Sequence, residues 1–205
     1  MKYVAAFLCM LLMVTVAVHA QKKSKQSKKG TPHVTEQKAS YAKGTVIVET
    51  SLGNIVIALN DSAAPKHSAN FRKLAKEGFY DSTTFHRVIP GFMIQGGDPN
   101  SKNGERHTHG MGGPEYRIDA EIGLTHDRGV IAAARQGDQI NPLRQSNGSQ
   151  FYITVADAKF LDGQYSVFGR VIEGMDVADK IVAVPRDQRD NPIEKIMIKK
   201  VTVVE

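Results

Sequence analysis

Short runs of apolar, often β-branched residues recur from about residue 44 to the end of the chain, separated by glycine-rich turns. The first two runs, residues 45–50 and 54–59, flank the turn Ser51-Leu52-Gly53 and predict a β-hairpin. Further strands are expected at 129–133, 150–154, 166–171 and 193–203. This pattern is typical of a mainly β fold and favours an all-β barrel over alternating strands and helices.

Two segments have helical spacing instead. Pro65 precedes Phe71, Leu74 and Ala75, and Gly78 follows them. This order predicts a helix with proline in its first turn and glycine just past its end. Its apolar positions share one face, which we expect to pack against the barrel. Residues 174–184 predict a second helix that is too apolar all round to be exposed.

The first 43 residues differ from the rest of the chain. Lys2 is followed by apolar residues 4–18 and then by Ala20, which is typical of a secretory signal peptide over residues 1–20. An uncleaved membrane anchor is the alternative, but about fifteen apolar residues are short against the roughly twenty that a spanning helix needs. Residues 21–43 are rich in lysine, serine and glutamine, so we expect a disordered linker there. Residues 44–205 are expected to fold as one domain.

The net charge of +6 comes from the N-terminal segments. Residues 1–43 contain eight lysines and one glutamate, which gives +7, and the other 19 basic and 20 acidic residues give −1. Because the domain is nearly neutral, we expect no nucleic-acid partner. The linker is interpreted as a solvated spacer, and a tether to anionic surfaces is its alternative.

Cysteine and histidine give little sign of a metal site or a disulfide. Cys9 is the only cysteine and lies inside the apolar stretch, so a processed chain would have no thiol, which is compatible with an oxidising compartment. His107 and His109 stand at alternate positions, with His126 further along, but they have no defined third ligand or cysteine. We expect no metal.

Three runs combine polar groups with aromatic residues. They are FHRVIPGFMIQGGD at 85–98, SNGSQFYI at 146–153 and FLDGQYSVFG at 160–169. Arg87, in the first run, cannot serve as a general base because a guanidinium does not lose its proton in proteins. It can donate several hydrogen bonds in a fixed fork to a partner beside it.

Together these runs resemble the cyclophilin family of peptidyl-prolyl cis-trans isomerases, and the resemblance covers about residue 44 to the C-terminus. It implies a closed, eight-stranded antiparallel β-barrel capped by two α-helices, with a shallow apolar groove on one outer face. It also implies a monomeric, cofactor-free enzyme that binds proline-containing peptides and unfolded proteins and rotates their X-Pro bonds.

The resemblance also assigns roles to residues of this chain. Arg87 is the expected catalytic donor to the prolyl nitrogen, and Gln95 is expected to hold the substrate backbone from the opposite side. The main chain near Ala134 and Arg135 is expected to pair with the extended peptide. The residues expected to line the proline pocket are Phe92, Met93, Tyr152 and Leu161. Phe160 and Tyr165 are expected at its rim, and Gln150 beneath it.

Residue type alone leaves other interpretations open. An isolated arginine on a strand is usually solvated or paired with an acid. Phe92, Met93 and Tyr152 are residue types that usually belong to a core, and only the resemblance separates pocket from core. Gln150 is equally compatible with a purely structural role, in which it would hydrogen-bond to loop carbonyls.

Four positions depart from the best-known members of the family. Arg135 stands where those members have asparagine, and the expected contact there is through the main chain. Tyr152 replaces a frequent phenylalanine, so its hydroxyl needs a partner or solvent. Phe160 replaces a tryptophan, Tyr165 replaces a histidine, and residues 136–145 form a longer turn beside the groove.

The expected function is that of an exported prolyl isomerase that assists the folding of other exported proteins. We expect a periplasmic location, with secretion or a secretory-pathway lumen as alternatives. The competing hypothesis is a chaperone or adaptor that holds proline-containing segments and turns them over only incidentally. The presence of Arg87 favours the enzyme.

Overall fold

The structure is a computed structural model that describes residues 41–205 of the 205-residue chain. The predicted signal peptide at 1–20 and nearly all of the predicted linker at 21–43 lie outside the described residues. The regular elements, in chain order, are β1 (Val46–Thr50), β2 (Gly53–Leu59), α1 (Pro65–Lys76), β3 (Arg87–Ile89), β4 (Met93–Gly96), β5 (Val130–Ala133), β6 (Phe151–Thr154), β7 (Val167–Glu173), α2 (Met175–Val182) and β8 (Ile198–Val203), with short 3-10 helices at Pro99–Ser101, Arg106–Thr108 and Lys159–Leu161.

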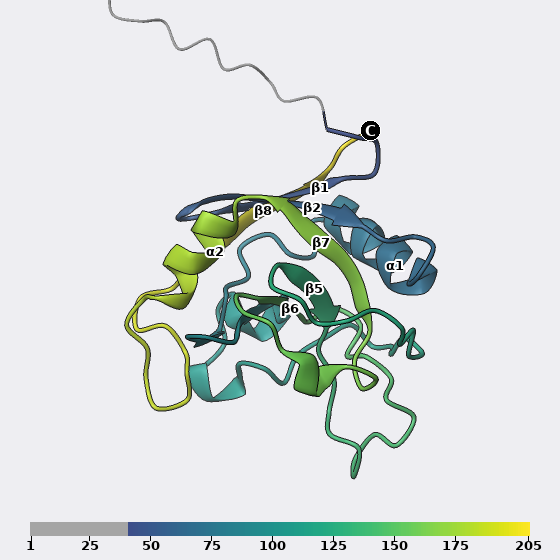
Figure 1. Ribbon diagram of the computed structural model, residues 1–205. Helices are drawn as coiled ribbons and strands as arrows, with labels where there is room; N and C mark the ends of the chain where they lie inside the picture. The colour runs from purple at the N-terminus through teal and green to yellow at the C-terminus, as the bar shows by residue number, and fades with distance from the viewer. Residues whose placement is uncertain (1–40) are drawn as a thin grey trace, which may run out of the picture. The chain divides into compact units, whose positions relative to one another are not determined.

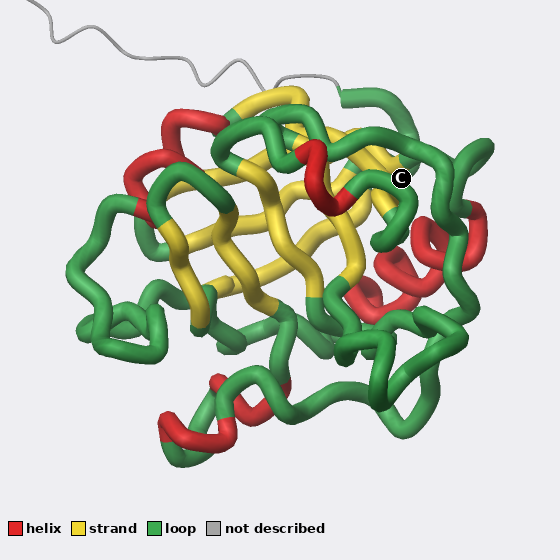
Figure 2. Tube along the Cα trace, turned by 60° about the horizontal axis from the view of Figure 1, so that its bottom comes forward, coloured by secondary structure: helices red, strands yellow, loops and turns green. Residues whose placement is uncertain are grey.

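The eight strands form one antiparallel sheet in the order β3-β4-β6-β5-β7-β2-β1-β8. Figure 2 shows the strands side by side in a curved layer. The expectation of a closed barrel is wrong, because β3 and β8 remain the two edges of this order and no ladder joins them. A single bridge between Thr84 and Met197 connects the segments just before these strands. The sheet is therefore a curled half-barrel.

The predicted elements are largely confirmed. The hairpin of β1 and β2 pairs in register from Val46 opposite Ile57 to Thr50 opposite Gly53. The strand expected at 193–203 begins only at Ile198. Before it the chain is irregular: the Ile193 amide donates to the Pro185 carbonyl at 2.9 Å, and the Ile196 carbonyl accepts from the Phe85 amide at 2.9 Å.

Both helices cover the main core, and Figure 1 shows them at opposite ends of the strands β1, β2 and β8, with α2 to the left and α1 to the right. α1 buries Phe71, Leu74 and Ala75, and the ring of Phe71 meets that of Phe151 edge-on at 5.4 Å. α2 lies close to the hairpin turn. A Cβ at Gly53 would lie 2.8 Å from Cγ2 of Val177, and its φ of +134° also favours glycine.

Strand alternation divides the buried apolar residues into two clusters. On β4 and β6, Ile94, Phe151 and Ile153 belong to the main core under the helices. Their neighbours Met93 and Tyr152 belong to a second, smaller cluster on the other face of the sheet. No helix among residues 41–205 is long and apolar enough to cross a membrane.

Candidate active site

A row of side chains crosses four neighbouring strands on the face opposite the main core. Arg87 on β3 pairs with Gln95 on β4, Gln95 with Tyr152 on β6, and Tyr152 with Ala132 on β5. Neighbouring strands lie about 4.8 Å apart, so the backbones at Arg87 and Tyr152 are about 10 Å apart. This row places a charged group, an amide and an aromatic ring within the span of a short peptide.

Hydrogen bonds between side chains link the polar end of this row. Nη1 of Arg87 donates to Oε1 of Gln95 at 3.4 Å, Nε2 of Gln95 donates to Oε1 of Gln150 at 3.0 Å, and Nε2 of Gln150 donates to the Gly112 carbonyl at 2.7 Å. Gln150 thus hydrogen-bonds to a loop carbonyl and also orients Gln95. The hydrogen bond from Gln150 to the Gly112 carbonyl matches the structural role that the sequence left open for this residue.

The Arg87 side chain makes few contacts that fix its position. Its bond to Gln95 is at the long limit for a hydrogen bond, and its side chain is exposed. It forms no ion pair with any carboxylate of residues 41–205. The guanidinium is therefore free to donate to a ligand on this face.

The second apolar cluster lies beside Arg87 and Gln95. Met93, only 2% exposed, is packed with other buried residues, and partly buried side chains surround them. Six of the predicted substrate-binding residues are brought together here. They are Phe92, Met93, Ala134, Tyr152, Leu161 and Tyr165.

Phe160 extends this apolar surface outward. Its side chain is 66% exposed, and its ring centre lies 5.4 Å from that of Phe92. The Phe160 carbonyl accepts a hydrogen bond from Nε2 of Gln164 at 2.8 Å. The residue expected at the pocket rim is thus an exposed aromatic edge.

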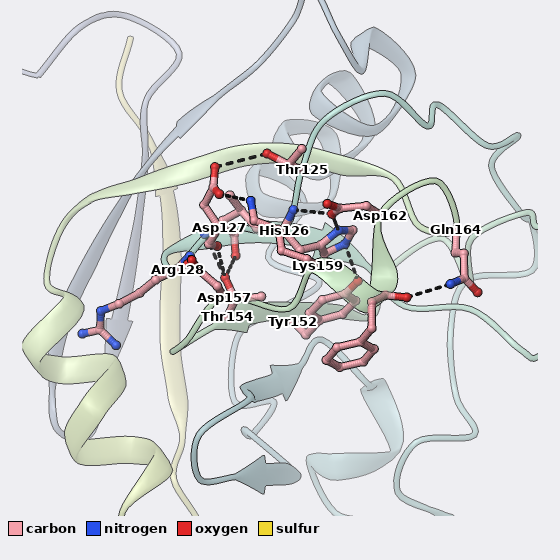
Figure 3. Close-up of polar contacts among 12 residues, drawn as sticks. Thr125, His126, Asp127, Arg128, Tyr152, Thr154, Asp157, Lys159, Asp162 and Gln164 are labelled. Atoms are coloured by element: carbon pink, nitrogen blue, oxygen red, sulfur yellow. Dashed lines mark hydrogen bonds and ion pairs between the residues drawn. The ribbon is translucent and has the colours of Figure 1, made fainter.

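The Tyr152 hydroxyl is 3.0 Å from Nε2 of His126, and Nδ1 of His126 is 2.9 Å from Oδ1 of Asp162 (Figure 3). Because the carboxylate can only accept, Nδ1 carries the proton and the Tyr152 hydroxyl donates to Nε2. Burial raises the pKa of Tyr152 well above its ordinary value. The hydrogen bond from the His126 ring lowers the pKa of Asp162, and a second bond from the His126 amide adds to this.

Residue type suggested His126 only as a possible metal ligand, and no local pattern marked it as the partner of Tyr152. His109 has separate partners, the side chain of Asn191 at 2.9 Å and the Gly104 carbonyl at 3.2 Å. Within the described part of the chain, no group of three or more His, Cys, Asp or Glu residues could hold a metal ion.

The side chain of Arg135 has a structural role in addition to the main-chain contact expected for this residue. Its side chain is only 3% exposed, and its guanidinium carbon lies 4.4 Å from the centre of the Tyr165 ring. It donates to Oδ1 of Asp138 at 2.6 Å, while Arg144 donates to Oδ2 of the same carboxylate at 2.8 Å. We call these three charged residues the loop clamp, because they fasten the long turn at 136–145 beside Tyr165.

A pocket of about 890 Å³ lies next to the row, between the loop clamp and the loop at 110–117. Gln95, Ala134, Arg135 and Gln150 line it. Its polar lining contrasts with the apolar cluster around Met93. A peptide across the row would therefore meet an apolar slot and a wider polar pocket.

Comparisons with known proteins agree with this geometry. The family described as cyclophilin type peptidyl-prolyl cis-trans isomerase/CLD matches residues 45–203. The peptidyl-prolyl cis-trans isomerase-like 1 of Neurospora crassa is 41% identical over 160 residues, 78% of this chain and 93% of its own. The peptidyl-prolyl cis-trans isomerase A of Dickeya dadantii is 42% identical over 163 residues, 77% of this chain and 80% of its own.

A solved structure is also similar. The crystal structure of a Cryptosporidium parvum cyclophilin type peptidyl-prolyl cis-trans isomerase, obtained in the presence of the dipeptide Ala-Pro, has a TM-score of 0.70 and 34% identity. The similarity covers 78% of this chain and 99% of that one. The chain belongs to the cyclophilin-type peptidyl-prolyl cis-trans isomerase family.

Proposed function

We propose that the domain rotates X-Pro bonds in unfolded or partly folded segments of exported proteins, with Arg87 as the catalytic donor. The row of Arg87, Gln95 and Tyr152 beside the apolar cluster is the observation that carries this proposal. No cofactor is required, because isomerisation breaks no covalent bond.

The chemical difficulty is the partial double bond between carbon and nitrogen. Delocalisation of the nitrogen lone pair leaves a rotational barrier of about 18–20 kcal/mol. A catalyst can lower this barrier by binding the twisted amide more tightly than either planar isomer. When the bond twists, the prolyl nitrogen becomes pyramidal and its lone pair becomes a hydrogen-bond acceptor.

Arg87 suits this task because it can donate to that nitrogen without losing its own charge. The planar amide has no such acceptor, so the interaction forms chiefly in the transition state and raises the rate rather than the affinity. The lightly held guanidinium, with only the long bond to Gln95, can turn to the substrate without breaking an ion pair.

The apolar cluster would hold the proline ring. Burial of a pyrrolidine ring against Phe92, Met93 and Leu161 would contribute on the order of 2 kcal/mol. This is enough to orient a substrate but not to bind it tightly, so weak and sequence-tolerant binding follows. The Cryptosporidium parvum structure, obtained in the presence of the dipeptide Ala-Pro, supports a ligand of this class.

The direct test is a prolyl-isomerisation assay on Arg87→Ala in the full chain. Loss of one preorganised donor should reduce kcat by about 10²–10³-fold, while peptide affinity changes little. Arg87→Lys is the matched variant, because it keeps the charge but lacks the planar fork, and it should recover only part of the rate. Turnover that survives Arg87→Ala would show that Arg87 is not the donor. If affinity for proline peptides persists but wild-type turnover is negligible, the chaperone or adaptor hypothesis holds.

The location of the protein is a separate part of this proposal. Support comes from Lys2, the apolar residues 4–18 and the small residue at position 20. We propose cleavage near Ala20 and a periplasmic location. The mass of the purified protein and its recovery in a periplasmic fraction would test this, and an intact N-terminus in the cytoplasmic fraction would contradict it.

A further inference from the structure

A second pocket, of about 320 Å³, adjoins the first and shares Gln95 and Gly110 with it. It shares Arg87 and Gln95 with the row that defines the candidate active site. Its other walls come from two loops, around residues 106–110 and 187–191. The lining residues are His86, Arg87, Gln95, Arg106, His109, Gly110, Asp187, Arg189 and Asn191.

Hydrogen bonds fasten these two loops to each other. Nη2 of Arg106 donates to Oδ2 of Asp187 at 2.8 Å and to the carbonyls of Asn191 and Pro192 at 3.1 and 3.0 Å. Arg189 reaches back to the His107 carbonyl at 3.3 Å. The pocket is therefore formed before any ligand arrives.

The pocket has a surplus of positive charge. Arg87 and Arg189 have no carboxylate partner among residues 41–205, whereas Arg106 is paired with Asp187. The hydrogen bond from Arg106 lowers the pKa of Asp187. Hydrogen bonds from the backbone amides of Asn191 and Arg189 to the same carboxylate add to this effect. Its charge is thus neutralised within the wall, and two guanidinium groups remain available.

His86 also lines the pocket, and the Asp98 carboxylate lies close enough to influence the charge of its ring. Asp98 is fully buried and accepts bonds from the amides of Asn100 and Gly110, so its oxygens are directed to the backbone. His86 is 4% exposed, and neither of its ring nitrogens has a hydrogen-bond partner in the described part of the chain. A buried imidazole without a partner is costly, and it adds an uncompensated polar group to the pocket wall.

From this geometry we propose that the pocket formed by Arg87, Arg189 and His86 is a subsite for an acidic side chain, aspartate or glutamate, of the peptide substrate. A carboxylate there would accept hydrogen bonds from guanidinium groups in a geometry that suits both partners. The inference rests on the proposed function, because the acidic residue belongs to the same chain as the isomerised proline.

The position of the pocket limits which residue of the substrate reaches it. Arg87 belongs both to the pocket wall and to the row that would meet the prolyl bond. An extended peptide advances about 3.3 Å per residue, so the acidic residue lies within about three residues of the proline.

The experiment compares matched peptides that carry Glu, Gln or Lys at each of the three positions on either side of one proline. At one of these positions, the Glu peptide should have a kcat/KM about tenfold above that of the Gln peptide at low ionic strength, and the Lys peptide should have the lowest kcat/KM. Added salt should reduce the difference between the Glu and Gln peptides. Arg189→Gln should abolish the preference for Glu and leave turnover of the Gln peptide unchanged. Arg170→Gln, on β7, removes the same charge outside the pocket and should preserve the preference.

Equal turnover of Glu and Gln peptides at every position would overturn the inference, and so would a preference that survives Arg189→Gln. Failure of the proposed function has a different signature, because then no peptide is isomerised. In that case the equilibrium affinities of the same peptides, measured by fluorescence anisotropy, still report on the subsite. A Glu peptide that binds no more tightly than its Gln counterpart would refute it.

Discussion

The guanidinium carbon of Arg135 lies over the ring of Tyr165, 4.4 Å from the ring centre. The same side chain donates a hydrogen bond to Asp138, which also accepts one from Arg144. The loop clamp therefore ties the turn at 136–145 to a residue of the apolar cluster, and its integrity should affect how substrates are held.

We expect Arg135→Ala to raise KM several-fold with little change in kcat, because Tyr165 and the turn would lose their common support. The loss of a nearly buried cation–π contact and its hydrogen bonds should also lower the free energy of unfolding by about 1–2 kcal/mol. Steady-state kinetics would measure KM and kcat, and hydrogen exchange of residues 136–145 would report the loss of stability in the turn. Arg144→Ala is the control, since it loosens the turn but leaves the Tyr165 contact, and an equal rise in KM there would contradict this account.

The hydroxyl of Tyr152 should matter for stability more than for turnover. Tyr152→Phe would leave Nε2 of the fully buried His126 without its donor and should cost about 1–2 kcal/mol of unfolding free energy. Turnover should stay within about threefold of the wild type, because the ring itself remains in the pocket. Tyr165→Phe removes a hydroxyl that has no hydrogen bond within residues 41–205, and urea denaturation should find it nearly neutral. Equal losses in the two variants would exclude the proposed role of His126.

The pH dependence of stability should be dominated below neutrality by buried histidines. Burial lowers the pKa of His86 from 6.5 to about 4, with Asp98 opposing this and His109 and Arg87 adding to it. Between these two pKa values the unfolded chain binds a proton at His86 and the folded chain does not. The contribution of His86 to the free energy of unfolding is therefore complete above pH 6.5 and falls as the pH drops toward 4. The difference amounts to about 3 kcal/mol for His86.

Burial also lowers the pKa of His67, although Glu121 opposes it, so His67 acts in the same direction. Urea denaturation between pH 7.5 and 4.5 should show this decline. His86→Leu should flatten it, whereas His107→Gln, at an exposed position, should leave it unchanged. A decline of the same slope in His86→Leu would remove His86 from this explanation.

Cyclosporin, the cyclic-peptide inhibitor of the family, should bind this protein well outside the nanomolar range. Phe160 stands where the family's best-known members have tryptophan, and a phenyl ring has no N–H to donate. Phe160→Trp should restore tighter binding, since the position is exposed and can take the larger ring. Nanomolar inhibition of the unmodified protein would show that the indole is dispensable.

Much of the site could be anticipated from the sequence through the family resemblance, which alone separated pocket residues from core residues. Ile94 between Met93 and Gln95, and Tyr152 between Phe151 and Ile153, mark which residues leave the core face. The resemblance supplied the roles, and the alternation explains why these residues meet on one surface.

The rest depended on long-range contacts that no local pattern reports. The closed barrel was wrong because no ladder joins β3 to β8 in the described part of the chain, and the isolated bridge between Thr84 and Met197 lies outside both strands. The burial of Arg135 depends on Asp138 and Tyr165, and the partner of Tyr152 lies in a loop 26 residues away. Side-chain partners of this kind follow from loop conformation, which residue type does not determine.

The two ends of the described chain have a practical consequence. The Gly44 amide donates to the Val204 carbonyl at 2.8 Å, and the Val204 amide donates to the Thr45 carbonyl at 2.9 Å. A circularly permuted gene that joins these ends through a short connector should therefore preserve the ladder between β1 and β8. New termini could then be opened in the turn at 136–145, which would test whether that turn must be continuous for the groove to form.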